Sequence, residues 1–281
     1  MKKGVNNKVI VILLSILLVA NVLLIVNSVK MNNELKEQQK IIEELTGAEI
    51  TDQDVEKADK NEDKTEETTQ KKSRGLKVAI DAGHQRKQNG DQEPIGPGAS
   101  ETKMKVTSGT EGCETKVPEH QVNLELAKKT EKILKDRGYE VFMVRDTADV
   151  DISNKERADM AYNSGADIFI RIHCNSSESP SANGALTMCQ TKSNQFVSMY
   201  DQSRKLSDDI LIELCAETGA NNNGVMEVDN MSGINWSKIP VTIIETGFMS
   251  NPDEDRKLSD PGYQDKIATG ISDGIDKYFA K

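Results

Sequence analysis

The sequence predicts an α/β fold: a mostly parallel, twisted sheet flanked by helices, preceded by a transmembrane helix and a disordered tether. Three successive kinds of segment along the chain support this. An apolar run near the start gives way to a polar, charged stretch, and that stretch gives way to short apolar runs alternating with amphipathic ones. The last pattern is typical of strands and helices that build a parallel sheet. The predicted divisions are a signal-anchor, a polar stalk with a flexible linker, and a folded domain, over 1–30, 31–75 and 76–281.

The apolar run covers residues 9–29 and follows Lys2, Lys3 and Lys8. A helix of that length can cross a bilayer, and the positive flank on its amino side favours one orientation. A cleaved signal peptide would have a shorter apolar run and small residues before the cut, which 18–20 matches poorly. An uncleaved signal-anchor is favoured. Under both interpretations we expect the folded domain outside the cell membrane, on the cell-wall side.

The stretch from about residue 48 to 75 is dominated by Asp, Glu, Lys and Thr, with almost no large apolar side chain. Such a composition cannot bury enough surface to fold, so a flexible tether is expected. The whole chain carries a net charge of -10. Because nucleic-acid binding asks for a basic face, a nucleic-acid partner is disfavoured.

Within the folded domain, short apolar runs predict strands and amphipathic stretches predict helices. The predicted strands are 77–80, 140–144, 167–173 and 241–245. The predicted helices are 119–137, 153–164, about 193–218, and 261–279. A long stretch rich in Gly, Ser, Thr and Pro, 88–118, is expected to lack regular structure. Long loops are often functional, so it is interpreted either as the rim of a binding groove or as an exposed spacer.

Ionisable residues stand at the ends of three predicted strands. His84 follows the first strand after an Ala-Gly turn, His173 closes the strand I-F-I-R-I-H, and Glu245 closes V-T-I-I-E. Parallel sheets place ligands at the carboxyl ends of their strands. A lone histidine at such a position is usually structural, but two histidines and carboxylates at one edge are the ligand set preferred by catalytic Zn²⁺.

A third protein ligand is expected from Glu119 or His120, which stand side by side at the start of a predicted helix. At about 100° per residue, Glu119 lies near the centre of the apolar face of that helix and His120 toward its edge. A carboxylate turned inward needs a partner, which a zinc ion would supply. The alternative is that Glu119 only complements the positive end of the helix dipole.

The domain resembles the zinc-dependent N-acetylmuramoyl-L-alanine amidases of the type 3 catalytic fold. The resemblance covers nearly all of the domain and rests on motifs in a fixed order. They are I-D-A-G-H at 80–84, E-x-x-x-N-L at 119–124, V-R-D-x-x-D at 144–149, E-R-A-x-x-A at 156–161, A-D-I-F-I-R-I-H-C-N at 166–175, and I-E-T-G-F-M-S-N at 244–251.

The resemblance implies one Zn²⁺ held by His84, Glu119 and His173, with Glu245 as the catalytic acid/base. It also implies the substrate, which is the amide bond between N-acetylmuramic acid and L-alanine in peptidoglycan. Three further motif residues are expected to contact substrate: Arg157, Arg171 and Asn175. The membrane segment at 9–29 would keep the enzyme close to this polymer.

The sequence departs from the usual family pattern at Gln85, Arg171 and Cys174, which puts the fit of the substrate in doubt but not the metal ligands. The four cysteines are scattered and predict no disulfide framework. Two other functions stay open. One is a catalytically weak or regulatory wall-binding protein of the same fold. The other is a zinc peptidase that acts on the stem peptide.

Overall fold

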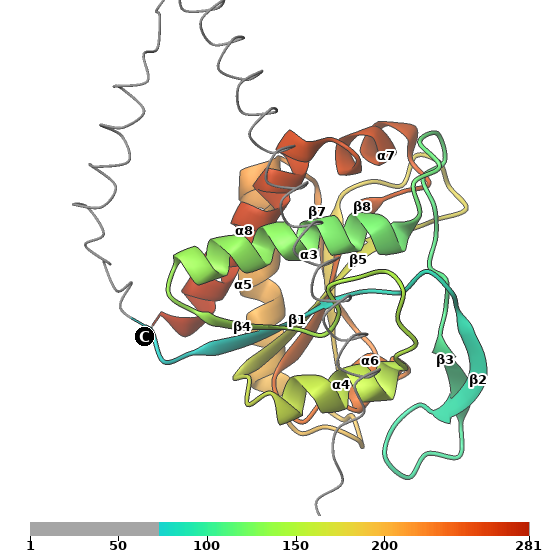
Figure 1. Ribbon diagram of the computed structural model, residues 1–281, viewed down its shortest axis with the longest axis vertical. Helices are drawn as coiled ribbons and strands as arrows, with labels where there is room; N and C mark the ends of the chain where they lie inside the picture. The colour runs from blue at the N-terminus through green and yellow to red at the C-terminus, as the bar shows by residue number, and fades with distance from the viewer. Residues whose placement is uncertain (1–72, 281) are drawn as a thin grey trace, which may run out of the picture. The chain divides into compact units, whose positions relative to one another are not determined.

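The computed structural model describes residues 73–280, which form a six-stranded sheet with helices on both faces and a separate two-stranded hairpin (Figure 1). The strands of the sheet are β1 (Lys77–Ala82), β4 (Glu140–Met143), β5 (Ile168–Asn175), β6 (Ala185–Cys189), β7 (Asn222–Glu227) and β8 (Val241–Phe248). The hairpin consists of β2 (Asn89–Pro94) and β3 (Thr102–Val106). The helices are α3 (Glu119–Asp136), α4 (Asn154–Asn163), α5 (Tyr200–Thr218), α6 (Ser232–Asn235), α7 (Pro252–Leu258) and α8 (Pro261–Phe279).

The strand order in the sheet is β4-β1-β5-β8-β6-β7. All neighbours pair in parallel except β6 and β8, which are antiparallel. The carboxyl ends of β1, β5 and β8 therefore lie at one edge. This topology confirms the predicted α/β fold with a mostly parallel sheet.

Alternate residues of the central strands pack into two separate hydrophobic cores, one on each face of the sheet. In β5, Ile168, Ile170 and Ile172 pack on the side of α3, α5 and α8, whereas Phe169 packs on the side of α4 and α6. Side chains along a strand alternate between faces, and both faces are covered, so the first three residues of the strand are all apolar. The same alternation places Arg171 and His173 on the α4 side.

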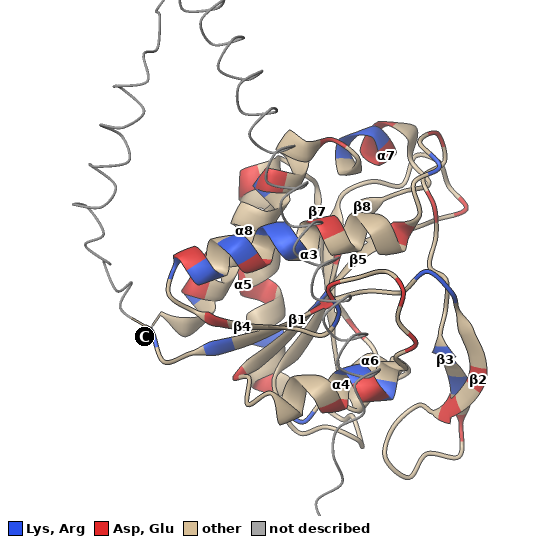
Figure 2. Ribbon diagram, viewed as in Figure 1, with Lys and Arg blue, Asp and Glu red and all other residues tan. Residues whose placement is uncertain are grey.

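Helices α5 and α8 pack closely because two glycines of α8 face the backbone of α5. A Cβ atom at Gly270 would lie 2.6 Å from the Cα of Leu214, and one at Gly274 would lie 2.4 Å from the Cα of Ile210. Any larger residue would push the helices apart. On the same face of the sheet, α3 carries acidic and basic residues along its exposed side (Figure 2), and some of them pair along the helix, such as Lys132 with Asp136.

A buried ion cluster joins β1, β5 and α4. Asp81 is fully buried between Arg157, whose Nη1 donates to Oδ1 at 2.6 Å, and Arg171, whose Nε donates to Oδ2 at 3.0 Å. Burial by itself raises the pKa of Asp81, but the two guanidinium charges outweigh it and hold that pKa well below its usual range. A capping box between Ser153 and Glu156 fixes the start of α4 and so positions Arg157.

Arginine side chains also hold the turn that follows β1. Arg145 donates to the carbonyl oxygens of Ala82 at 2.7 Å and Gly83 at 3.0 Å. Arg157 donates to the carbonyl oxygens of Ala82 and His84, both at 3.1 Å. His84 has a φ of 62°, a left-handed conformation that is uncommon for residues other than glycine. The arginines satisfy three consecutive carbonyl groups and keep the strained turn in place.

The four predicted strands are all present, and the helices predicted at 119–137, 153–164 and 261–279 lie within a residue of their observed bounds. The helix predicted from about residue 193 begins only at Tyr200. The residues before it form a turn, because the side chain of Asn194 accepts hydrogen bonds from the backbone of Phe196 and Val197.

The prediction of no regular structure in 88–118 is wrong, because this stretch contains the β2–β3 hairpin. Strand β2 reads N-G-D-Q-E-P and is mostly exposed, so it has neither the apolar alternation nor the β-branched residues that indicate a strand. Strand β2 forms because its backbone pairs with that of β3. Strands β6 and β7 were likewise not predicted.

The predicted membrane segment at 9–29 and the tether as far as residue 72 lie outside the described residues. The predicted end of the tether at residue 75 is slightly too late, because Arg74 already pairs with Asp276 of α8. Among residues 73–280, no helix is both long and apolar enough to cross a membrane.

The Asp81 cluster is expected to stabilise the fold, and this can be tested by substitution. Asp81→Asn removes the charge that two buried guanidinium groups share, so we expect a loss of about 3 to 5 kcal/mol of unfolding free energy. Urea denaturation followed by circular dichroism measures it. The matched control is Asp149→Asn, which breaks the exposed pair with Arg86 and should leave the midpoint nearly unchanged. Equal midpoints for the two variants would contradict the role of the cluster.

Candidate metal centre

His84 is oriented by a backbone group of the segment that follows the hairpin. Its Nδ1 lies 2.9 Å from the carbonyl oxygen of Thr107. Because a carbonyl can only accept, Nδ1 carries the proton and Nε2 is left with a lone pair. That Nε2 lies 3.3 Å from Oε2 of Glu119.

Glu119 is the first residue of α3 and is 2% exposed. Its Oε2 accepts from the backbone of Thr110 at 2.9 Å, and its Oε1 accepts from Asn123 at 3.0 Å and from the backbone of Cys174 at 3.1 Å. Burial raises the pKa of Glu119, but the hydrogen bond with His173 and the interaction with the ring of His84 outweigh it and hold that pKa well below the usual value. The buried carboxyl group is therefore ionised.

His173 lies on β5 with its Nδ1 3.2 Å from Oε1 of Glu119. Its ring packs directly on Gly83, where a Cβ atom would lie 2.2 Å from the ring, so only glycine leaves room for it. Burial, opposed by the hydrogen bond with Glu119, lowers the pKa of His173 to about 4. The imidazole is thus neutral, which is the form that binds metals.

The donor set fits a zinc ion. His84, Glu119 and His173 each offer one ligand atom, and these atoms all lie within 4.8 Å of one another. In its neutral form, His84 Nε2 faces a carboxylate oxygen, so two acceptors point at each other, and a cation between them removes the conflict. Two ligands each about 2.0 to 2.1 Å from a tetrahedral zinc ion lie roughly 3.3 Å apart, and Nε2 of His84 lies 3.3 Å from Oε2 of Glu119. Nε2 of His173 is also buried without a hydrogen-bond partner.

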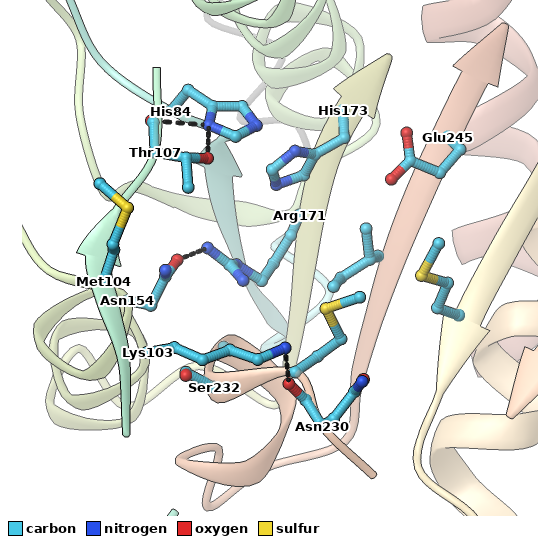
Figure 3. Close-up of a pocket in the computed structure, with 14 residues that line it drawn as sticks. His84, Lys103, Met104, Thr107, Asn154, Arg171, His173, Asn230, Ser232 and Glu245 are labelled. Atoms are coloured by element: carbon cyan, nitrogen blue, oxygen red, sulfur yellow. Dashed lines mark hydrogen bonds between the residues drawn. The ribbon is translucent and has the colours of Figure 1, made fainter. Parts of the chain in front are cut away.

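Glu245 lies on β8 directly beside His173 in the sheet register. Its Oε2 is buried and has no hydrogen-bond partner, and the side chain points toward His173 (Figure 3). Burial, reinforced by the charge of Glu119 and opposed by Arg171, raises the pKa of Glu245 to about 8. A carboxyl group with a pKa near neutrality can both accept and release a proton in a reaction.

These side chains open onto a cavity of about 450 Å³ (Figure 3). His84, His173 and Glu245 lie at one end of it. The hairpin side contributes Lys103, Met104 and Thr107, and the rest of the wall includes Asn154, Arg171, Met188, Asn230, Met231, Ser232, Gly233 and Ile243. The 88–118 segment therefore forms one wall of the pocket, in agreement with its interpretation as the rim of a groove.

The three residues expected to contact substrate have different surroundings. Arg171 lines the cavity. Arg157 is fully buried and donates to Asp81 and to the turn after β1, so it does not reach the pocket and instead positions His84. Asn175 ends β5 and does not line the cavity; its side chain accepts from the backbone of Ser176.

Two alternatives for the metal ligand do not join the cluster. His120 lies next to Glu119 but is not among the residues that converge, as expected from its place at the edge of the helix face. Cys174 points into the opposite core and bonds with Thr246, as expected from the alternation along a strand.

Residues that hold the site from the hairpin segment were missed by sequence reasoning. Thr107 orients His84, and the backbone of Thr110 donates to Glu119. Between them, Gly109 has a φ of 77°, and a Cβ atom there would lie 2.5 Å from Oε2 of Glu119. Apart from the hydroxyl of Thr107, which lies 3.1 Å from Nδ1 of His84, these contacts are made by backbone atoms. Residue identity therefore carries little signal, and only the glycine could have indicated a close approach.

Comparison with known proteins agrees with this geometry. Residues 78–277 match the family described as N-acetylmuramoyl-L-alanine amidase. This chain belongs to that family. It is 32% identical over 161 residues to the N-acetylmuramoyl-L-alanine amidase LytC of Bacillus subtilis, a match that covers 57% of this chain and only 31% of LytC.

Solved structures of amidases share the fold of this family member. The N-acetylmuramoyl-L-alanine amidase from Clostridium difficile 630 matches with a TM-score of 0.60 and 28% identity, covering 73% of this chain and 97% of that structure. The catalytic domain of CwlV, from Bacillus (Paenibacillus) polymyxa var. colistinus, matches with a TM-score of 0.58 and 30% identity, covering 72% of this chain and 97% of that structure.

The convergence of three ligands generates a test of metal content. We expect the purified protein to hold about one zinc ion per chain, and His173→Ala to lose it, since structural and catalytic sites need every ligand. His120→Ala is the matched control and should keep its zinc. Elemental analysis after dialysis measures both. Loss of zinc from His120→Ala with retention in His173→Ala would show that the ligand set is wrong.

Proposed function

We propose that this chain hydrolyses the amide bond between N-acetylmuramic acid and L-alanine in peptidoglycan, using one Zn²⁺ held by His84, Glu119 and His173 and using Glu245 as acid/base. Membership of the amidase family supports the reaction and the substrate. The observation that carries the mechanism is the buried, unpartnered oxygen of Glu245, which lies beside the three converging ligands and at the same end of the cavity.

The residues divide the chemistry between them. When bound, zinc would polarise the scissile carbonyl and bring the pKa of a water molecule toward neutrality. Glu245 accepts the proton of the attacking water and delivers it to the amide nitrogen as the carbon–nitrogen bond breaks. The products are a lactyl carboxylate on the sugar and a free amino group on L-alanine. Thr107 and Glu119 keep both histidines in orientation throughout.

Glu245→Gln tests this role, because it keeps the shape of the side chain but removes the oxygen that accepts a proton. We expect the variant to keep its zinc and its fold and to lose about 10² to 10⁴ in kcat. Mass spectrometry of muropeptide digests measures the rate of cleavage and also identifies which bond is cleaved. A variant near full activity would contradict the assignment, and release of D-alanine by the wild type would favour the zinc peptidase instead.

We further propose that residues 9–29 hold the domain at the outer face of the cell membrane, with the tether between them. The apolar run of those residues and its positive flank support this placement. A long flexible leash would let the domain search a polymer that lies just outside the membrane.

This placement predicts how the chain fractionates. The protein should stay with the membrane fraction, and protease added to intact protoplasts should release a fragment that begins within residues 48–75, since a chain without packed structure is cut first. N-terminal sequencing of the fragment checks it. A soluble mature form that starts near Asn21 would show instead that the segment is cleaved.

A further inference from the structure

The cavity has a second end, away from the metal ligands, that is rich in hydrogen-bond donors. We call it the cationic end and define it as Lys103, Arg171 and Ser232. Figure 3 shows Lys103 and Ser232 at the opposite end of the pocket from His84 and Glu245, with Arg171 between. Glu245 is the only acidic residue that lines the cavity within the described part of the chain.

The guanidinium group of Arg171 has N–H donors that are not used within the protein. Its Nε donates to Asp81 and its Nη2 donates to Asn154 at 2.8 Å, but no described residue accepts from Nη1. Nη1 lies against Gly233, where a Cβ atom would be 1.6 Å away, so the glycine makes room for the guanidinium group. Asp81 is shared between Arg157 and Arg171, so its single negative charge leaves one of the two positive charges uncompensated.

Lys103 and Ser232 are also incompletely satisfied. The ammonium group of Lys103 donates to the carbonyl oxygen of Asn230 at 2.7 Å and forms no ion pair among residues 73–280. The hydroxyl of Ser232 is buried, with the residue 5% exposed, and has no partner. A buried polar group without a partner is costly, so a bound ligand is expected to supply one.

We propose that the cationic end binds a free carboxylate on the second residue of the stem peptide, the residue that follows L-alanine. Two cations and a free hydroxyl match a carboxylate, whereas sugar hydroxyls would not require the charges. In an extended peptide the second residue lies roughly 7 Å from the scissile bond, within reach of a cavity of about 450 Å³ that also contains Glu245. This subsite rests on the proposed function, because it takes the orientation of the peptide from that reaction.

The test compares two muropeptides that differ at one group. Both carry N-acetylmuramic acid and the same tripeptide, with either a carboxylate or a carboxamide on the second residue. With the full-length zinc protein we expect kcat/KM to be about 10- to 100-fold higher for the carboxylate, the usual worth of a hydrogen bond to a charged group. Equal values for the two substrates would overturn the proposal.

Lys103→Met tests whether the cationic end is where the carboxylate binds. Lys103 takes no part in the buried ion cluster, so its replacement should not disturb the fold. We expect this variant to lower kcat/KM for the carboxylate substrate about tenfold or more and to change that for the carboxamide much less. The matched control is Lys105→Met, which removes a lysine of the same strand that pairs with Asp91 outside the pocket and should change neither. Equal losses on both substrates in Lys103→Met would also overturn the proposal.

A binding measurement separates this inference from the reaction. Calorimetric titration of the Glu245→Gln protein with each muropeptide should show tighter binding of the carboxylate form, and Lys103→Met in that background should remove the difference. If the wild type cleaves neither substrate, the proposed function fails, and this titration still decides the subsite. Equal affinities for the two peptides would show that the cationic end does not recognise the carboxylate.

Discussion

The site depends on one constraint, which is that the turn after β1 keeps a strained conformation while its carbonyl groups are buried. Arg145 and Arg157 donate to three consecutive carbonyls of this turn, and Asp81 pairs with Arg157 and Arg171 in the interior. Removing a buried charge partner is expensive. The sheet edge is therefore held rigidly where His84 leaves it, and a metal ligand needs that rigidity.

The two carboxyl groups of the site have opposite character because their surroundings differ. The imidazoles of His173 and His84 hold the pKa of Glu119 low. Three N–H groups also donate to this carboxylate, so it suits a metal ligand. Glu245 is buried with an unpartnered oxygen and near a second negative charge, so its pKa is raised to about 8. Environments that push the pKa values of neighbouring carboxyl groups apart are how an active site separates a ligand from an acid/base.

The segment between His84 and Glu119 does two things at once. Its backbone orients both of these ligands through Thr107 and Thr110, and its strand β3 supplies Lys103 to the far wall of the cavity. The same segment therefore determines both the geometry of the metal centre and the shape of the pocket. A change that shifts the backbone of this segment is expected to affect metal affinity and substrate preference together.

The sequence by itself determined the parallel sheet, the edge that carries the site, and the candidate ligands His84, Glu119 and His173, because periodicity and strand ends are local properties. It placed Glu119 rather than His120 on the buried face for the same reason. Tertiary structure alone decided the β2–β3 hairpin, the tautomer of His84, and the separation of Arg157 from Arg171, one inside the fold and the other on the cavity wall. These features arise from contacts between backbone groups and side chains far apart in the chain, and no local pattern of residues encodes such contacts.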